Sequence, residues 1–180
     1  MGQEKKLSLN IEKMAHALSA FAIDREDVKE ILAAVPADAG LNMTTLEYEL
    51  QLLKILSVGW ALSFFMPPAD KNKGPLTQSF WENIREISGN ISSLTQTTTG
   101  KSVDYFEILK ERLDTYLNAM RENPETSQNP AIIMGPAFAS TCGSENNAVA
   151  ILFGTKMFTL TLGAVKEYLN SVTIDDIKLN

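Results

Sequence analysis

Residues 44–66, TTLEYELQLLKILSVGWALSFFM, combine the start signal of a helix with a long apolar face. Thr44 and Glu47 have the three-residue spacing of a capping box, in which each side chain bonds to the backbone of the other residue. Apolar residues then recur every three or four positions on one helical face: Leu46, Leu50, Leu53, Leu56, Trp60 and Phe64. This periodicity predicts a helix over residues 44–66.

The two halves of this predicted helix differ in polarity. In the first half, Glu47, Gln51 and Lys54 give a polar face opposite the apolar one. After Lys54 no charged residue follows until Asp70, so the second half is apolar on all sides. A helix of that kind is surrounded by other helices. We therefore expect residues 44–66 to form the central, buried helix of the protein.

Helical patterns on both sides of this segment predict an all-α fold. Residues 10–35 are expected to form an N-terminal hairpin of two short helices, capped by Asn10 and Asp24. After a polar loop, Ser79 and Glu82 repeat the capping-box spacing. The apolar stripe that follows has strict 4-3-4-3 spacing and predicts an amphipathic helix: Phe80, Ile84, Ile87, Ile91 and Leu94. We expect residues 92–102 to form a polar connector and residues 103–121 to form the next helix.

Residues 129–170 are strongly apolar and predict two C-terminal helices. Pro136 falls inside the first pattern and is expected to kink or end that helix, because proline lacks a backbone N–H and crowds the carbonyl four residues earlier. In residues 156–163, alternating Phe, Leu and Thr favour a strand, whereas the spacing from Val149 to Leu160 favours a helix. We predict one helix here, followed by a short acidic extension or frayed end.

Taken together, these patterns predict one all-α domain over residues 1–180. It consists of six or seven helices in an irregular bundle around the buried helix at residues 44–66, with the last helix also near the centre. A chain of 180 residues is long enough to bury a sizeable core.

Composition and charge restrict the classes of partner. The formal net charge is −6, with 22 acidic and 16 basic residues and no long Lys/Arg cluster, so a nucleic-acid partner is not expected. The first ten residues lack the apolar segment of a secretory signal, and the uncharged residues 55–69 are too few to span a bilayer. The single cysteine, Cys142, cannot form an internal disulfide and is compatible with a reducing compartment. We expect a cytoplasmic protein that does not bind membranes.

The motifs of nucleotide and metal sites are incomplete in this chain. Gly100-Lys101-Ser102 lacks the first glycine of a phosphate-binding loop, since position 95 is Thr95. One histidine, His16, and one cysteine cannot supply the three or four nitrogen and sulfur ligands of a zinc site. No Glu-x-x-His pair is present for a di-iron bundle. We therefore expect no metal ion and no cofactor.

For each candidate catalytic group, a structural role is a better explanation than a catalytic one. Cys142 precedes the predicted start of the last helix, where a thiol can be activated, yet a free cysteine is more often a small buried apolar residue. His16 lies off the apolar stripe of its helix, and spacing offers it no partner. Carboxylate pairs occur on charge-rich helix faces rather than in apolar clefts. No catalytic residue is predicted, and an enzyme ranks third among the possible functions.

The leading hypothesis is a non-catalytic protein that acts through binding, either as a homo-oligomer or as a module for a protein partner. Its positive support is the apolar helix surface in residues 129–165. Ala150 and Gly154 are four residues apart, so a partner helix could approach closely along that edge. The predicted interface consists of Val149, Ala150, Phe153, Gly154 and Met157.

The alternative is a small-molecule sensor or carrier with an apolar pocket between helices, where bundles commonly place ligands. A kink at Pro136 would help to open such a pocket. The predicted pocket consists of Trp60, Phe64, Met134, Pro136 and Phe138. The structural interpretation of the same residues is that they fill the core.

Overall fold

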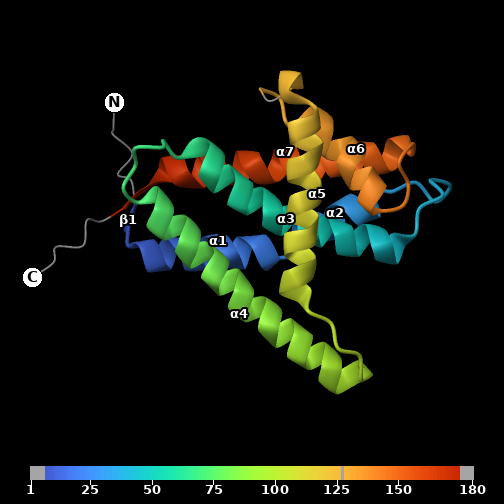
Figure 1. The fold of residues 1–180 in the computed structure, drawn as a ribbon, viewed down its shortest axis with the longest axis horizontal. Coiled ribbons are helices and arrows are strands. Elements are labelled where there is room, and N and C mark those ends of the chain that lie inside the picture. Colours follow the sequence, from blue (N-terminus) through green and yellow to red (C-terminus); the bar gives the residue numbers. More distant parts are fainter. Residues whose placement is uncertain (1–6, 127, 175–180) are drawn as a thin grey trace, which may run out of the picture.

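The computed structural model describes residues 7–126 and 128–174, and 76% of these residues are helical. This confirms the predicted all-α bundle (Figure 1). The described part contains, in chain order, β1 (Leu7–Leu9), α1 (Ile11–Ile23), α2 (Glu26–Ala33), α3 (Met43–Phe65), α4 (Lys73–Thr99), α5 (Tyr105–Glu122), a 3₁₀ turn (Pro124–Thr126), α6 (Ala131–Thr141), α7 (Ala148–Ser171) and β2 (Val172–Ile174).

Helix α3 is the buried central helix that the sequence predicts. Every residue from Leu52 to Gly59 is buried, and α1, α2, α4, α5, α6 and α7 all contact α3. The helix begins one residue earlier than predicted, because the side chain of Asn42 accepts a hydrogen bond from the backbone N–H of Thr45 at 3.0 Å. Asn42 therefore caps α3, in place of the expected capping box at Thr44.

Helix α7 is continuous through residues 156–163, as predicted, so the alternating pattern there does not form a strand. Its buried residues in this region, Met157, Phe158, Thr161 and Val165, follow the three- and four-residue spacing of a helix. Helices α6 and α3 cover one side of α7. Pro136 lies inside α6, and the helix continues for five residues beyond it to Thr141.

Helix α4 is longer than predicted at both ends. It begins at Lys73, so Ser79 lies inside the helix and does not cap it. At the other end it continues through residues expected to be a connector, up to Thr99. The hydroxyl groups there donate to backbone carbonyls four residues earlier, which satisfies them inside the helix. The helix stops at Gly100, whose φ of 70° favours glycine.

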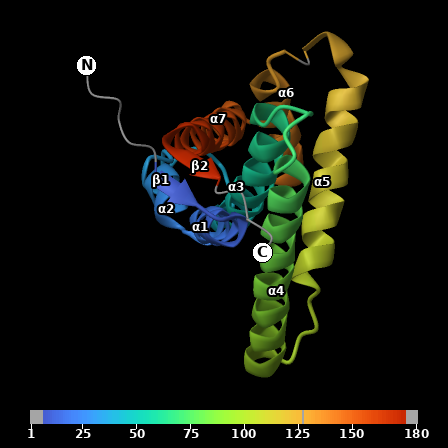
Figure 2. The same ribbon diagram turned by 90° about the vertical axis from the view of Figure 1, so that its left-hand side faces the viewer.

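The N-terminal helices do not pair with each other as the predicted hairpin requires. Helix α1 contacts mainly α4 and α3, whereas α2 contacts mainly α3 and α7. The sequence also did not predict the short parallel pair of β1 and β2, in which Leu7 lies opposite Val172. This pairing brings the two ends of the described chain side by side (Figures 1 and 2). The rest of the acidic tail, residues 175–180, lies outside the described residues.

Candidate functional site

The predicted interface residues lie largely inside the protein. Ala150, Phe153, Gly154 and Met157 are buried, and only Val149 is partly exposed. A Cβ atom placed on Gly154 would be 2.5 Å from Cδ1 of Phe138, so α6 already occupies the edge that the sequence assigned to a partner. The close approach predicted for Gly154 is real, but it joins α6 and α7 within one chain.

The predicted pocket residues also do not come together around a cavity. Met134 and Phe138 are buried in the core, whereas Phe64 and Pro136 are exposed and Trp60 is intermediate. None of these five side chains lines any of the five best-defined cavities in the described part of the chain. The aromatic and Met residues of α6 therefore act in packing.

Cys142 lies in a buried polar cluster where α3, α5 and α6 meet. Arg112 donates two hydrogen bonds to Glu49, from Nε at 2.8 Å and from Nη2 at 2.7 Å, and the Glu49 side chain is only 3% exposed. Burial, and to a lesser extent the nearby Glu49 carboxylate, raises the pKa of Cys142 to about 12. The thiol is therefore protonated at neutral pH, which is the opposite of an activated nucleophile.

His16 lies on α1 and has surroundings that its spacing in the sequence did not reveal. It is exposed and lines a recess of about 280 Å³ between α1 and α4, together with Glu86, Asn83 and Asn90. No hydrogen bond or ion pair joins His16 to Glu86 among the described residues. His16 and Cys142 are therefore not brought together, and within the described ranges no three His, Cys, Asp or Glu side chains converge on a metal position.

The exposed end of α4 is the surface feature that stands out. Along the predicted stripe, Phe80 and Ile84 are buried, but Ile91 is 38% exposed and Leu94 is 64% exposed. The backbone N–H of Tyr105 donates to the hydroxyl of Ser92 at 3.0 Å, so α5 begins at the level of Ser92. The last two turns of α4 extend beyond that point and project from the body (Figures 1 and 2).

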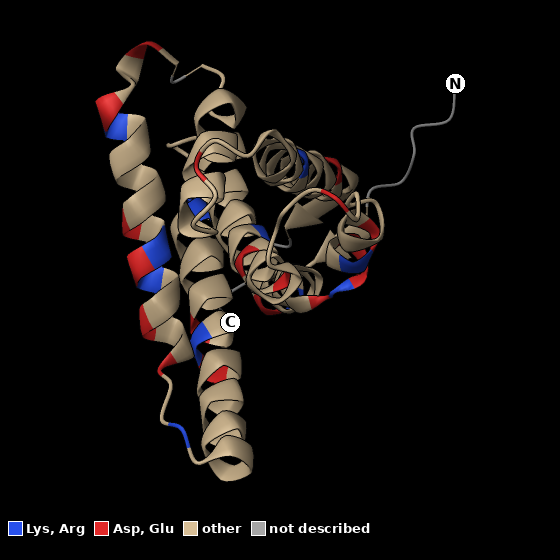
Figure 3. Cartoon of the chain, turned by 90° about the vertical axis from the view of Figure 1, so that its right-hand side faces the viewer, with Lys and Arg blue, Asp and Glu red and all other residues tan. Residues whose placement is uncertain are grey.

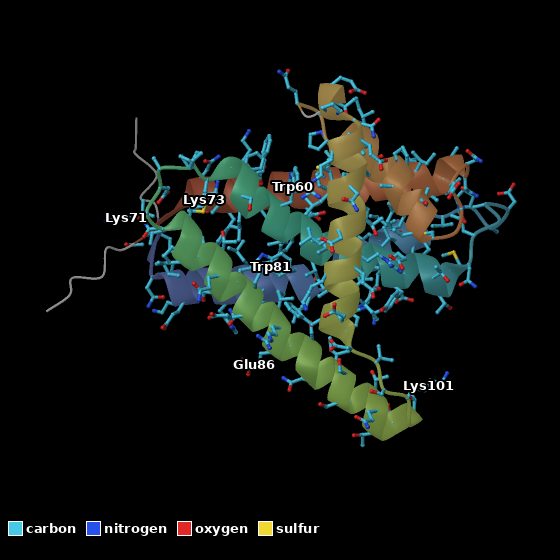
Figure 4. The ribbon with its side chains drawn as sticks, in the orientation of Figure 1. Trp60, Lys71, Lys73, Trp81, Glu86 and Lys101 are labelled. Atoms are coloured by element: carbon cyan, nitrogen blue, oxygen red, sulfur yellow. The ribbon has the colours of Figure 1, made fainter. Side chains whose placement is uncertain are left out.

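We call residues 89–99 the α4 tip. No charged residue occurs between Glu86 and Lys101, the two labelled residues that bracket it in Figure 4. In Figure 3 the ribbon of the tip carries no colour of acidic or basic residues, in contrast to α5 beside it. Because Thr95, Thr97, Thr98 and Thr99 donate their hydroxyls to carbonyls of the same helix, their methyl groups remain available for apolar contacts. The tip thus combines exposed Ile91 and Leu94 with a surface that carries no charge.

Helix α7 is the one described helix whose length and composition would suffice to cross a membrane. It is also a helix on which α3 and α6 pack, and buried core helices have the same composition. No protein-family model, curated protein sequence or solved structure matches this chain. The geometry of the chain itself is therefore the basis for its functional assignment.

Proposed function

We propose that this protein is a non-catalytic binding protein that associates with a second copy of itself through the α4 tip. The observation that carries the proposal is that solvent exposure increases along the apolar stripe of α4, from fully buried Phe80 to Leu94, which is 64% exposed. A heptad-like apolar seam normally pairs with another helix along its whole length. Within one chain, the apolar seam of α4 is uncovered beyond the level at which α5 begins.

Charge favours a second copy as the occupant. The chain carries a net charge of −6, so two copies repel each other overall. The α4 tip has no charged side chain and meets no such repulsion. A two-fold arrangement would place Ile91 and Leu94 of both copies in one contact, as closed dimers require of a self-complementary patch.

The same segment is small, which determines the kind of association we expect. Residues 89–99 extend over about 16 Å at 1.5 Å per residue. Two such segments bury less than the roughly 800 Å² per partner of a standard stable interface. We therefore expect a dimer that forms at high protein concentration and dissociates on dilution.

A non-catalytic role agrees with the state of the reactive groups. The Cys142 thiol is held protonated, and the buried Glu49 carboxylate is fully engaged by Arg112. The buried Lys54 ammonium is likewise paired, with Asp27. Groups engaged in this way stabilise the fold and are not free to transfer protons or attack a substrate.

Sedimentation velocity over a range of protein concentrations tests the proposal. The wild type should show a rising average mass, and Leu94→Glu should stay monomeric with at least a tenfold higher dissociation constant, because the contact would bury an unpaired charge. Leu152→Glu on α7 is the matched control, since Leu152 is also highly exposed, at 61%. Its association should equal that of the wild type.

Two results would contradict the assignment. One is a wild type that remains monomeric at millimolar concentration. The other is an oligomer that Leu152→Glu dissociates and Leu94→Glu does not, which would move the interface to α7. Circular dichroism of both variants should match the wild type, because both positions are exposed.

A further inference from the structure

A cavity of about 330 Å³ lies at the base of the α4 tip, where α3, α4 and α5 meet the end of α1. Ile55 and Tyr105 line it and are buried, so they form its floor. Ile23, Tyr48 and Ile91 also line it but are 37–38% exposed, so they form its rim. We call this cavity the Tyr48 pocket.

The Tyr48 pocket is continuous with the α4 tip. Ile91 belongs to both, and Leu94 follows Ile91 by one helical turn. Together with Ile23 and Tyr48, these residues account for four of the ten large hydrophobic side chains that are exposed in the described part of the chain. Exposed apolar side chains that gather in one place mark an interaction site, whereas scattered ones are ordinary.

The charges at the pocket favour an uncharged occupant. Arg25 and Glu47 both line it, and their side chains form an ion pair with each other. Among the described residues that line the pocket, these two are the charged ones. A charged segment would have to break this pair or lose its own solvation. The α4 tip of a second copy is apolar and has no charge, so it fits this requirement.

A two-fold arrangement brings that occupant to the pocket. Two α4 tips related by a two-fold axis midway between Ile91 and Leu94 run antiparallel, so Leu94 of one copy lies at the level of Ile91 of the other. The two positions are about 4.5 Å apart along the helix, at 1.5 Å per residue. Since Ile91 is at the rim of the Tyr48 pocket, Leu94 of the second copy reaches its mouth. At the roughly 50° crossing angle common in globular proteins, the helices diverge on both sides of this contact.

We propose, on the basis of the self-association inferred above, that Leu94 of each copy inserts into the Tyr48 pocket of the other copy. The two insertions are equivalent, as a two-fold contact requires. Insertion covers the exposed part of Tyr48 and adds Ile23 and Tyr48 to a contact that two tips alone leave small. The interface then consists of α1 and α3 residues as well as the α4 tip.

Two charge variants that restore each other test the contact. Leu94→Glu puts an acid at the inserting position, and Tyr48→Lys puts a base in the pocket. Tyr48→Lys alone should raise the dissociation constant of the dimer at least about fivefold, because Leu94 of the second copy would desolvate the lysine. A heterodimer of the two variants has one Glu–Lys contact and one unchanged contact, so the opposite charges compensate each other.

Met43→Lys is the matched control for Tyr48→Lys. Met43 is also an exposed residue of α3, at 42%, and the two variants have the same net charge, but Met43 does not line the pocket. Met43→Lys should dimerise like the wild type. Labelled Leu94→Glu, used as a dilute tracer in sedimentation velocity, should bind Tyr48→Lys at least about fivefold more tightly than Met43→Lys, after correction for the self-association of each partner.

Two results would overturn the insertion and leave self-association through the tip in place. One is a Tyr48→Lys variant that dimerises like the wild type, and the other is a Leu94→Glu tracer that binds both lysine variants equally. A wild type that stays monomeric at millimolar concentration would overturn both proposals. If circular dichroism shows that Tyr48→Lys does not fold, Ile23→Lys at the same rim takes its place with the same expected results.

Discussion

Nζ of Lys54 on α3 lies 2.7 Å from Oδ2 of Asp27 on α2, and the Lys54 side chain has no solvent exposure. The same ammonium donates to the backbone carbonyl of Asp24, just past the end of α1, at 2.9 Å. It also lies 4.4 Å from the centre of the Phe21 ring, a cation–π distance. One buried lysine thus ties the end of α1 and the start of α2 to the central helix.

This arrangement predicts an asymmetric response to mutation. Asp27→Asn should lower the free energy of unfolding by about 2–3 kcal/mol, because it leaves the buried Lys54 charge without its nearest counter-charge. Lys54→Met should cost less, about 1 kcal/mol, because Asp27 is 38% exposed and water can solvate it. Urea unfolding at pH 7 measures both. Lys29→Gln is the control, with less than about 0.5 kcal/mol expected, because its ion pair with Glu26 is exposed. A larger loss for Lys54→Met than for Asp27→Asn would contradict this account.

Two glycines at the contact of α6 and α7 predict a packing penalty. A Cβ atom at Gly135 would be 2.8 Å from the backbone carbonyl oxygen of Ile151, and one at Gly154 would meet the Phe138 ring. Gly135→Ala and Gly154→Ala should each destabilise the protein by about 1–3 kcal/mol, with Gly135→Ala the more costly because a backbone atom is in the way. Gly163→Ala, also in α7 but with open space around it, should instead be neutral or stabilising by up to about 1 kcal/mol. Thermal unfolding of the three variants provides the comparison, and equal midpoints would show that the helices can separate without cost.

The raised pKa of Cys142 predicts a slow thiol. At pH 8 the thiolate that reacts with a disulfide reagent is scarce, because burial and the Glu49 carboxylate favour the protonated form. The reaction with 5,5′-dithiobis(2-nitrobenzoic acid) should be at least about tenfold slower than that of glutathione. In guanidinium chloride the same cysteine should react at the rate of an ordinary thiol. A fast reaction in the folded protein would restore a reactive role for Cys142.

Stability should fall at alkaline pH. Burial raises the pKa of Tyr116 above the usual 10.0 and that of Cys142 from 9.0 to about 12. Above pH 9 the unfolded chain therefore releases protons that the folded chain still holds, and the free energy of unfolding decreases as pH rises. For Cys142 this contribution is complete below pH 9 and is lost between pH 9 and about 12.

Tyr116→Phe checks this explanation, with urea unfolding at several pH values from 8 to 11. The Tyr116 hydroxyl is buried without a well-formed hydrogen bond among the described residues, so the variant should be at least as stable as the wild type at pH 7. It should also lose less stability above pH 10, since the titrating group is gone. The same slope in both proteins would mean that Tyr116 does not contribute to alkaline unfolding.

The sequence correctly predicted that the segments are helices and which helix is central, because both features depend on patterns within one segment. A periodic apolar face identified α3, and helical spacing outweighed alternation in α7. The ends of α4 were predicted wrongly for a local reason. Gly74 and Pro75 resemble a loop but fit the first turn of a helix. At the other end, hydroxyl side chains up to Thr99 donate to backbone carbonyls of the preceding turn, so these polar residues are satisfied within the helix.

The candidate sites depend on contacts between segments, and spacing alone did not find them. Spacing marked Gly154 as an edge that a partner helix could approach, and only the packing shows that Phe138 of the same chain fills it. In the same way, Gln51 and Tyr105 are 54 positions apart in the sequence and line one cavity because α3 and α5 are neighbours.

The sequence by itself determined the set of helices and the burial of α3, because the spacing of apolar residues identifies the helix face that is buried on folding. Only the tertiary structure decided what covers each face. Lys54 belongs to a polar helix face by its spacing, yet it is fully buried because Asp27 and the end of α1 supply a counter-charge and an acceptor. Leu94 continues an apolar stripe, yet it is exposed because α5 begins at the level of Ser92 and does not extend alongside Leu94. The energy of a side chain in either case depends on its neighbours, and those come from distant parts of the chain.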